Sequence, residues 1–408
     1  MADILSTFPD EVLCHILSFL RTKHAVATSV LSKRWNHLWH SVPVLDFTNT
    51  ILTNQNANFR FNDFVYSVLL SRISALPIKA FKISLTYDYI EDVNLRIPNF
   101  SMWINFLLQG GVQHLDLFLG LPGVRSLPYT LLTCKTLVSL NLLFFSINVT
   151  PPSIQLPSLK TLYLRYTFFP RGQDFMLLLA GCPILEDLLV SKLWWFPYKD
   201  SLTTNRWKNF TLTNLTQATI DSTYFHFPLE PLLNVHSLSI SMAKMDSYNH
   251  VLPTFHNLTS LDLNSFNYRW HFLIQLLKHS PNLQTLKLNE AGTDEESWTR
   301  KDDKENWVDP DFVPQCLSLH LKTCHLLSFL GLQGEFLLAK YILKNSTVLQ
   351  TMKIWNGGQP EIERLLQSCP RASSMCKLTV YHVSYDDGAS ELNLPLDTSG
   401  SCGGGGND

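Results

Sequence analysis

The chain has 408 residues, which is long for one compact core, so two or three structural units are expected. Its formal net charge is −2 and it contains no block of basic residues, which argues against a nucleic-acid-binding protein. Charged residues make up only 16%, against about 25% in a typical soluble protein. We therefore expect partners to be recognised by neutral polar and aromatic groups.

Targeting and redox features predict an intracellular protein, in the cytoplasm or the nucleus. No apolar run approaches the roughly 18 residues of a membrane span, and no signal peptide opens the chain, so no membrane contact is expected. The eight cysteines form no CxxC pair and no Cys/His cluster. This scatter indicates reduced, buried thiols rather than disulfides or a metal site.

The first 45 residues predict a small helical unit. Pro9 suits the first turn of a helix, because its missing N–H loses no hydrogen bond there. Apolar residues recur at helical spacing over residues 12–20, and two shorter helices are expected over His24–Val30 and Ser32–Trp39. About 40 residues cannot bury so much apolar surface in a core of their own. This surface should therefore meet a partner.

The same stretch resembles an F-box, the three-helix module by which substrate receptors bind the Skp-type adaptor of a cullin–RING ubiquitin ligase. The matching residues are Phe8-Pro9, Val12-Leu13, Ile16 to Leu20, Ala25-Val26, Ser29 to Trp35, Leu38-Trp39 and Val42-Pro43. Two positions depart from the usual pattern, Phe8 in place of Leu and Arg21 in place of Pro. The resemblance implies an adaptor-binding set consisting of Phe8, Pro9, Val12, Ile16, Leu17, Leu20, Val30, Leu31, Trp35, Leu38 and Trp39. The alternative is a plain helical cap on the next domain.

Residues 46–77 are expected to lead from the F-box into a second part. Residues 46–60 are polar and irregular, which predicts a linker or loop. A helix should follow, ending near Pro77. Its apolar face would consist of Phe64, Val65, Val68, Leu69 and Ile73.

Residues 78–290 contain a repeated pattern of two apolar residues separated by one other residue, typical of leucine-rich repeats. It occurs at 81–83, 115–117, 140–142, 162–164, 188–190, 218–220, 238–240, 261–263 and 286–288. Each copy predicts a short strand, and neighbouring strands should stack into a parallel sheet lining one face of an arc. Return helices are expected over Met102–Leu108, Phe175–Ala180 and Trp270–Lys278. The alternative is an ordinary globular α/β core.

The residue between the two apolar positions should point outward, because strand side chains alternate. The resulting candidate substrate-binding residues are Asp116, Asn141, Tyr163, Ser239, Asp262 and Lys287. An aromatic segment, residues 193–198, interrupts the repeats after the strand at Leu188. Its Trp194, Trp195 and Tyr198 either pack against the repeats or contact the substrate, because exposed aromatic clusters often mark binding sites.

The last quarter of the chain changes character. Residues 291–312 are acidic and are most simply a solvated loop, or else a contact for a basic partner. Residues 313–390 resemble the FBD domain that follows leucine-rich repeats in a large plant F-box family. The match rests on Val313 to Leu317, Leu321-Lys322, Gly331, Gly334, Ala339 to Asn345, Leu349 to Met352 and Cys369 to Ser374. This domain should cap the open end of the repeats. The Gly-rich residues 391–408 predict a disordered tail.

The sequence contains no catalytic motif of the HExxH, GxSxG or phosphate-loop type, so no catalytic residue, metal or cofactor is predicted. The expected fold is α/β, with an F-box, a leucine-rich-repeat solenoid and an FBD cap. The resemblance implies a non-enzymatic, substrate-recognition subunit that binds a Skp-type adaptor and, through it, cullin and RING subunits. Its protein substrate is unknown. The alternatives are a non-degradative F-box scaffold and a small-ligand receptor that uses the repeat arc.

Overall fold

A computed structural model describes most of the chain. The described residues are 7–72, 76–87, 97, 99–120, 125–148, 154–195, 207, 210–221, 227–241, 252–265, 269–290, 307–356 and 360–382. They belong to two compact units. The first comprises residues 1–185, 193–200 and 397–408, and the second comprises residues 186–192 and 201–396.

The first unit begins with the predicted helical module. Its longest helix is α1 (Asp10–Leu17), which starts directly after Pro9 as expected. The two shorter predicted helices each end in a 3-10 turn, so that α2 (Thr22–Ala27) leads into η2 (Thr28–Val30) and α3 (Trp35–Leu38) into η3 (Trp39–Ser41). A core inside this module consists of Leu13, Leu17, Ala25, Trp35, Leu38 and Val42. The three-helix prediction is confirmed, and the module has a small core of its own.

The loop predicted over residues 46–60 is wrong. Strand β1 (Val44–Leu52) pairs in parallel with β2 (Ala80–Tyr87), and helix α4 (Gln55–Ser71) begins three residues after β1 ends. Leu45 and Phe47 are buried and alternate with the partly exposed Val44, Asp46 and Thr48, which is the alternation of a strand. The side chain of Asn54 caps α4 by accepting the backbone N–H of Ala57 at 2.8 Å. The polar composition thus came from one exposed strand face and from a helix cap.

Two hydrogen bonds attach the helical module to this region. The backbone N–H of Asp46 in β1 donates to the hydroxyl of Thr22 at 2.7 Å. The guanidinium of Arg72, at the end of α4, donates to the carbonyl oxygen of Trp39 at 3.1 Å. Arg72 is almost fully buried, and burial lowers its pKa to about 10. Of the predicted apolar face of α4, Val65, Val68 and Leu69 are buried, whereas Ile73 lies outside the described residues.

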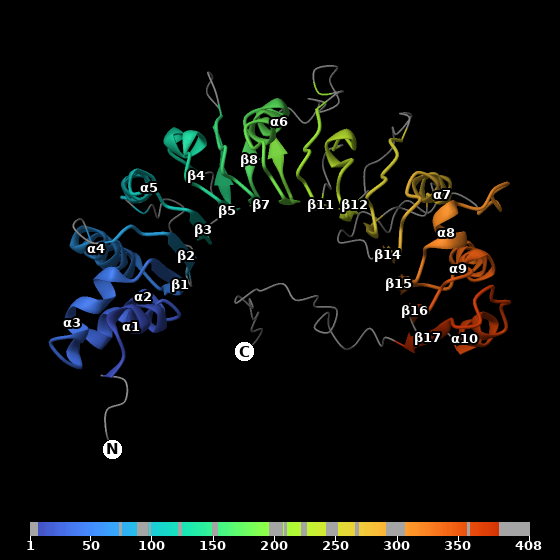
Figure 1. The fold of residues 1–408 in the computed structure, drawn as a ribbon, viewed down its shortest axis with the longest axis horizontal. Coiled ribbons are helices and arrows are strands. Elements are labelled where there is room, and N and C mark those ends of the chain that lie inside the picture. The colour runs from blue at the N-terminus through green and yellow to red at the C-terminus, as the bar shows by residue number, and fades with distance from the viewer. Residues whose placement is uncertain are drawn as a thin grey trace. The chain divides into compact units, whose positions relative to one another are not determined.

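The first unit continues as a parallel sheet of strands at the predicted positions. Its strand order is β1-β2-β3-β5-β7, where β3 is His114–Leu119, β5 is Ser139–Leu143 and β7 is Thr161–Arg165. Helices α4, α5 (Phe100–Gln109) and α6 (Gly172–Ala180) lie on one side of these strands (Figure 1). A 3-10 turn, η4 (Tyr129–Thr133), returns the chain to β5. The two apolar residues of each repeat are buried, which confirms the repeat prediction.

A second, smaller parallel sheet was not predicted. Its strands have two residues each and the order β10-β8-β6-β4, with β4 at Arg125–Ser126, β6 at Phe145–Ser146, β8 at Phe168–Phe169 and β10 at Trp194–Trp195. Phe144 and Tyr166 come just before β6 and β8 and adopt φ values of 66° and 49°. A non-glycine residue rarely takes this left-handed conformation, and it turns the chain sharply from the main strand into the small sheet.

The second unit joins the remaining repeats to the C-terminal part in one parallel sheet. The order is β9-β11-β12-β13-β14-β15-β16-β17. The bounds are β9 Asp187–Ser191, β11 Gln217–Asp221, β12 Ser237–Ser241, β13 Ser260–Asn264, β14 Thr285–Asn289, β15 Thr323–Phe329, β16 Thr351–Asn356 and β17 Lys377–His382. The repeat pattern predicted β9 and β11 to β14, and the apolar residues Met352 and Ile354 predict a further strand, which is β16; β15 and β17 were missed. Because β14 pairs directly with β15, the C-terminal part extends the sheet of the repeats.

Helices cover one side of the C-terminal strands of this unit (Figure 1). They are α7 (Trp270–Lys278), α8 (Gln315–Leu319), α9 (Gln333–Asn345) and α10 (Pro360–Gln367), preceded in the chain by the turn η6 (Glu230–Leu232). The prediction of α7 agrees with the structure at both ends. For the C-terminal part, the sequence predicts an amphipathic helix over Phe336–Asn345 with Phe336, Ala339, Ile342 and Leu343 inward, and the observed α9 starts three residues earlier. Ala339, Ile342 and Leu343 of α9 are buried as expected.

Glu335 stabilises the start of α9, and replacing it should destabilise the protein. Its buried carboxylate accepts the backbone N–H groups of Leu330 at 3.0 Å and Leu332 at 2.9 Å. Glu335→Ala leaves both donors without this partner, so we expect the free energy of unfolding to fall by about 1–3 kcal/mol. The exposed Glu361→Ala should change it by less than about 0.5 kcal/mol. Urea unfolding followed by tryptophan fluorescence measures both, and equal effects would contradict the capping role.

Candidate protein-binding surfaces

The helical module of the first unit exposes several large apolar side chains. We name this the N-terminal apolar surface; it consists of Phe8, Val12, Ile16, Phe19, Leu20, Val30 and Leu31. Three of its side chains are mostly exposed to solvent: Val30 is 85% exposed, Phe19 76% and Leu31 65%. Exposed apolar patches on small modules usually mark a partner site. Phe19 was absent from the predicted set, although its apolar type and helical spacing signalled it.

Three residues of the predicted adaptor-binding set lie elsewhere. Leu17, Trp35 and Leu38 are buried in the core of the module. Their apolar character holds the helices together, so they support the N-terminal apolar surface from within and do not form part of it. Trp39 is half-buried, with its ring stacked on His40 at a centroid distance of 3.9 Å, and Pro9 is exposed at the start of α1.

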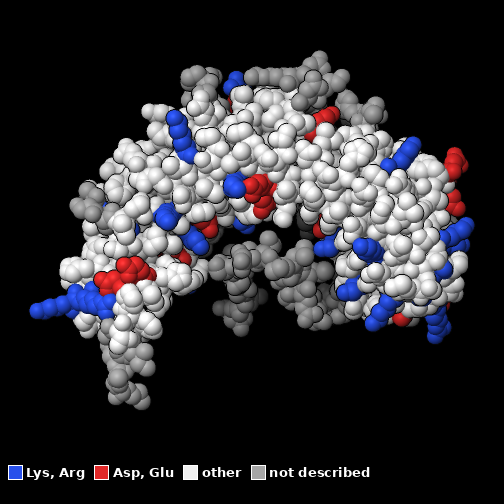
Figure 2. Space-filling view, in the orientation of Figure 1, with Lys and Arg blue, Asp and Glu red and all other residues white. Residues whose placement is uncertain are grey.

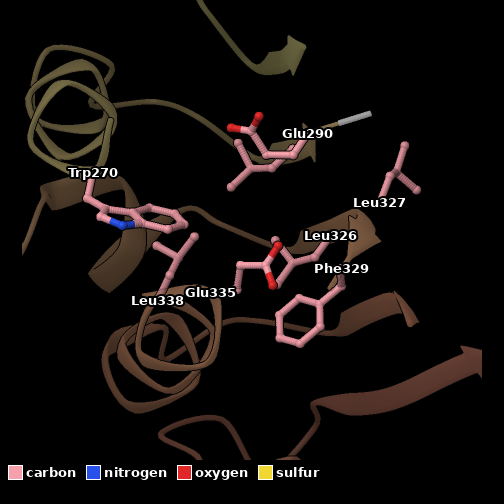
Figure 3. A pocket seen from close by; sticks show the side chains of 8 residues that line it. Trp270, Glu290, Leu326, Leu327, Phe329, Glu335 and Leu338 are labelled. Carbon is pink, nitrogen blue, oxygen red and sulfur yellow. The ribbon is translucent and has the colours of Figure 1, made fainter. Parts of the chain in front are cut away.

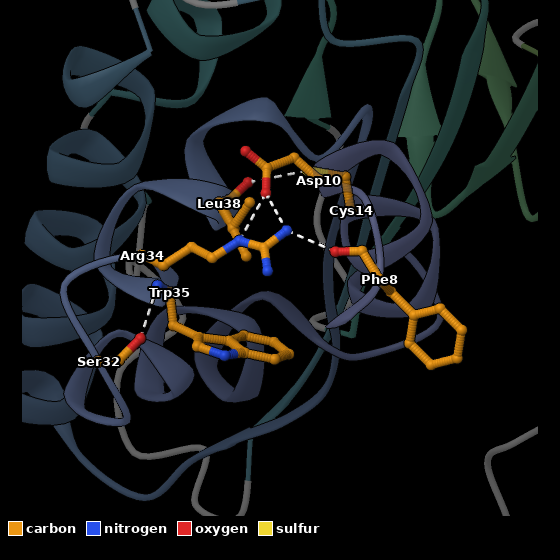
Figure 4. A network of polar contacts seen from close by, with 7 residues as sticks. All are labelled: Phe8, Asp10, Cys14, Ser32, Arg34, Trp35 and Leu38. Carbon is orange, nitrogen blue, oxygen red and sulfur yellow. Dashed lines mark hydrogen bonds and ion pairs between the residues drawn. The ribbon is translucent and has the colours of Figure 1, made fainter. Parts of the chain in front are cut away.

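A polar contact fixes α1 against the segment that precedes α3 (Figure 4). Arg34 donates from Nε and from Nη2 to Oδ1 of Asp10, at 2.8 and 2.6 Å, and from Nη2 to the carbonyl oxygen of Phe8 at 2.5 Å. A second contact joins α1 to α3, in which Sγ of Cys14 donates to the carbonyl oxygen of Leu38 at 3.4 Å. Since both Arg34 and Asp10 are exposed, the ion pair contributes at most about 1 kcal/mol, and its effect is chiefly to orient Phe8 and α1.

The six candidate residues on the strands occupy the expected outward positions. Asp116, Asn141 and Tyr163 of the first unit and Ser239, Asp262 and Lys287 of the second are all half-buried between fully buried apolar neighbours. Nδ2 of Asn141 donates to Oδ1 of Asp116 at 2.9 Å across two paired strands. Burial raises the pKa of the Asp116 carboxyl, although Lys82, Arg165 and the bond from Asn141 act in the opposite direction. The structure confirms the outward direction and leaves substrate contact as a prediction.

The aromatic residues of segment 193–198 differ in how deeply they are buried. Trp195 is only 2% exposed in β10, so it packs inside the first unit and cannot contact a substrate. Trp194 is half-buried and ends a row of ring contacts that runs Phe118–Phe144–Tyr166–Trp194, with centroid distances of 6.1, 4.8 and 6.3 Å. Tyr198 lies outside the described residues. The substrate-contact prediction for Trp195 is therefore wrong, because β-pairing with Phe169 turns its ring into the core.

The second unit contains a small apolar pocket (Figure 3). Trp270, Leu326, Phe329 and Leu338 line it, with the carboxylates of Glu290 and Glu335 at its edge. Its volume of about 20 Å³ is far below the roughly 300–1,000 Å³ of a typical small-molecule site. This pocket therefore gives no support to the small-ligand-receptor alternative.

The cysteines of the described chain are free thiols, and all but Cys14 are buried. Burial raises the pKa of Cys182, Cys316 and Cys324 to about 12 in each case, so these thiols are protonated and weakly nucleophilic at neutral pH. Within the described ranges, no group of three or more His, Cys, Asp or Glu residues could hold a metal ion. Among the described helices, none combines the length and apolar character needed to cross a membrane.

Comparison with known proteins agrees with this architecture. An F-box family model matches residues 5–47, a model described as FBD matches residues 309–354, and a model described as "FBD-associated F-box protein At5g56370, LRR repeats" matches residues 100–214. The chain is 32% identical to the Arabidopsis thaliana F-box/LRR-repeat protein At4g14103 over 358 residues, which cover 70% of this chain and 91% of the relative. It is 29% identical over 425 residues to the F-box/FBD/LRR-repeat protein At4g26340 of the same plant, covering 92% of this chain and 99% of the relative.

An N-terminal F-box, a parallel repeat sheet and a C-terminal FBD region define a class of plant F-box proteins. The chain belongs to the F-box/FBD/leucine-rich-repeat family.

Proposed function

We propose that the protein is the substrate-recognition subunit of a Skp–cullin–F-box ubiquitin ligase, working in the cytoplasm or the nucleus. The observation that carries this proposal is the N-terminal apolar surface, because it lies on the segment that matches the F-box model. An F-box implies a Skp-type adaptor as partner, and the adaptor would connect the chain to cullin and RING subunits.

The energetics of the N-terminal apolar surface suit a stable protein–protein contact. Complete burial of a large apolar side chain is worth about 1.5–3 kcal/mol. Burial of Val30, Leu31 and Phe19 together would offset much of the cost of association, estimated at 4–15 kcal/mol. The half-exposed Val12 and Ile16 on α1 would add to this burial.

The role of this chain in ubiquitination would be to position a substrate and not to perform covalent chemistry. In such ligases the bond to ubiquitin is formed by the conjugating enzyme. Holding a substrate beside that enzyme converts an encounter in solution into an intramolecular one and raises the effective concentration of the substrate lysine. The outward strand residues and the FBD region would provide the substrate contacts.

Substrate turnover separates this proposal from a non-degradative scaffold. Proximity labelling with the intact protein under proteasome inhibition would identify captured proteins. We expect the half-life of at least one of them to lengthen when the protein is removed, and to be restored by wild-type protein but not by a variant with a defective F-box. Captured partners whose half-lives never change would favour the scaffold.

A further inference from the structure

The outward face of β14 to β17 gathers cationic and aromatic side chains in adjacent rows. The pairing register places Lys287, His325 and Lys353 side by side on neighbouring strands. The next row holds Trp355 and Tyr381, whose rings stack at a centroid distance of 5.0 Å and an interplanar angle of 22°. His325 links the two rows, with its ring edge 5.6 Å from the Trp355 ring. We name these five residues the C-terminal basic–aromatic face.

This face carries positive charge with no carboxylate within it. The remaining outward positions of the four strands are Thr285, Asn289, Thr323, Leu327, Thr351, Lys377 and Thr379. Burial lowers the pKa of His325, and the positive charges of Lys353 and Lys287 on the neighbouring strands lower it further. Asp262 flanks the face, since it is the register partner of Lys287 on the neighbouring strand. Glu363 bonds to His382 at 3.0 Å, but His382 follows Tyr381 and therefore points to the opposite side of the sheet.

The C-terminal part of the chain, residues 313–382, is more basic than the chain as a whole. Residues 313–382 contain seven Lys and Arg residues against three Glu and no Asp, a surplus of four positive charges, whereas the full chain has a net charge of −2. Figure 2 shows Lys and Arg outnumbering Asp and Glu over the part of the surface that carries the C-terminal strands. One of the three glutamates, Glu335, is buried in the cap of α9, and another, Glu363, pairs with His382.

We infer that the C-terminal basic–aromatic face binds an extended acidic segment of a protein partner. This inference rests on the proposed function, since it names the kind of substrate segment that the FBD region would recognise. Neighbouring strands are about 4.8 Å apart, so Lys287 and Lys353, two strands apart, are separated by roughly 10 Å. A peptide in the extended polyproline II conformation advances about 3.1 Å per residue with three residues per turn, so carboxylates three positions apart lie on the same side, roughly 9 Å apart, and match the two ammonium groups.

The aromatic pair and the hydroxyl groups complete the recognition of such a segment. An apolar or aromatic side chain of the peptide would pack against Trp355 and Tyr381, since aromatic residues often supply the largest share of binding energy. The threonines beside the lysines would donate hydrogen bonds to the carboxylates. A nucleic acid would suit this face less well, because Asp262 flanks the short cationic row and would repel a continuous phosphate backbone.

Fluorescence polarisation with full-length protein tests the inference directly. The probe is a short labelled peptide with two glutamates three positions apart and a neighbouring phenylalanine; the matched probe carries glutamines instead. We expect Lys353→Glu and Trp355→Ala each to weaken binding of the acidic probe by about tenfold or more. Lys344→Glu makes the same charge change on an exposed part of α9 and should alter it less than about twofold. Circular dichroism verifies that each variant is folded, and Lys353→Arg should retain binding.

Three outcomes would overturn the inference: equal binding of the glutamate and glutamine probes, equal losses for Lys353→Glu and Lys344→Glu, or a single-stranded oligonucleotide that outcompetes the acidic probe. Adaptor binding measured on the same Lys353→Glu protein distinguishes failure of this inference from failure of the proposed function. If the adaptor still binds while the acidic probe does not distinguish the variants, only the inference about this face fails.

Discussion

Replacing Val12 and Ile16 together by aspartate is expected to weaken binding of a Skp-type adaptor by at least about 100-fold. Both side chains lie on the exposed side of α1, where each is 40% exposed. Because each side chain is already more than half covered, losing the burial of both removes only about 1–2.5 kcal/mol, and the desolvation of two carboxylates placed in an apolar contact costs several kcal/mol more. Since 1.4 kcal/mol corresponds to tenfold in affinity, the expected loss exceeds 100-fold.

The structure provides matched controls for this double variant. Leu70→Asp introduces a single aspartate at an exposed apolar position of α4, outside the F-box, and should leave adaptor binding unchanged. Leu17→Asp places a carboxylate in the core of the module, so we expect this variant to unfold the module and to lose helical signal in circular dichroism. Isothermal titration calorimetry measures adaptor affinity, and circular dichroism measures folding. A folded Val12→Asp/Ile16→Asp protein that binds the adaptor normally would show that α1 is not at the interface.

Removing residues 313–408 is expected to make the remaining chain aggregate. Strand β14 would lose its partner β15 and become an open edge, which readily pairs with other chains. The fully buried Leu286 would lose the packing supplied by Cys324 beside it, and α7 would lose the contact in which Sγ of Cys316 donates to the carbonyl oxygen of Leu277 at 3.3 Å. The FBD region and the repeats of the second unit should therefore not be separable.

Size-exclusion chromatography with light scattering measures this effect. A chain lacking only residues 391–408, which the sequence predicts to be a disordered tail, is the control and should run as the intact protein does. A monomeric and cooperatively unfolding chain ending at residue 312 would contradict a continuous sheet through β14 and β15.

The repeat strands could be predicted because their signal is local and repeated. Leu140 and Leu142, or Leu261 and Leu263, are buried as the alternation required. Strand β1 was missed because Asp46, Thr48 and Asn49 on its partly exposed positions gave a polar composition typical of loops. The small sheet was missed because a two-residue strand has no periodicity, and its position depends on the left-handed Phe144 and Tyr166, which sequence rules assign to glycine or asparagine.

The residues of the candidate surfaces could also be predicted only in part from the sequence. An apolar residue on a short helix could belong to the adaptor surface or to the core, and only the packing of α1 against α3 separates Ile16 and Val12 from Leu17 and Trp35. Trp194 and Trp195 were equivalent as sequence, but strand alternation turns one ring inward. The C-terminal basic–aromatic face involves Lys287, His325, Lys353 and Tyr381, which are far apart in sequence and meet only through strand register.

Ubiquitin transfer in a reconstituted ligase tests the central claim most directly. The full-length protein would be combined with a Skp-type adaptor, cullin, RING subunit, conjugating enzyme and a partner identified by proximity labelling. The account predicts ubiquitination of that partner with wild-type protein and with Leu70→Asp, and loss of it with Val12→Asp/Ile16→Asp. Transfer that continues at the wild-type rate when the N-terminal apolar surface is disrupted, in a protein that still binds the partner, would contradict the account.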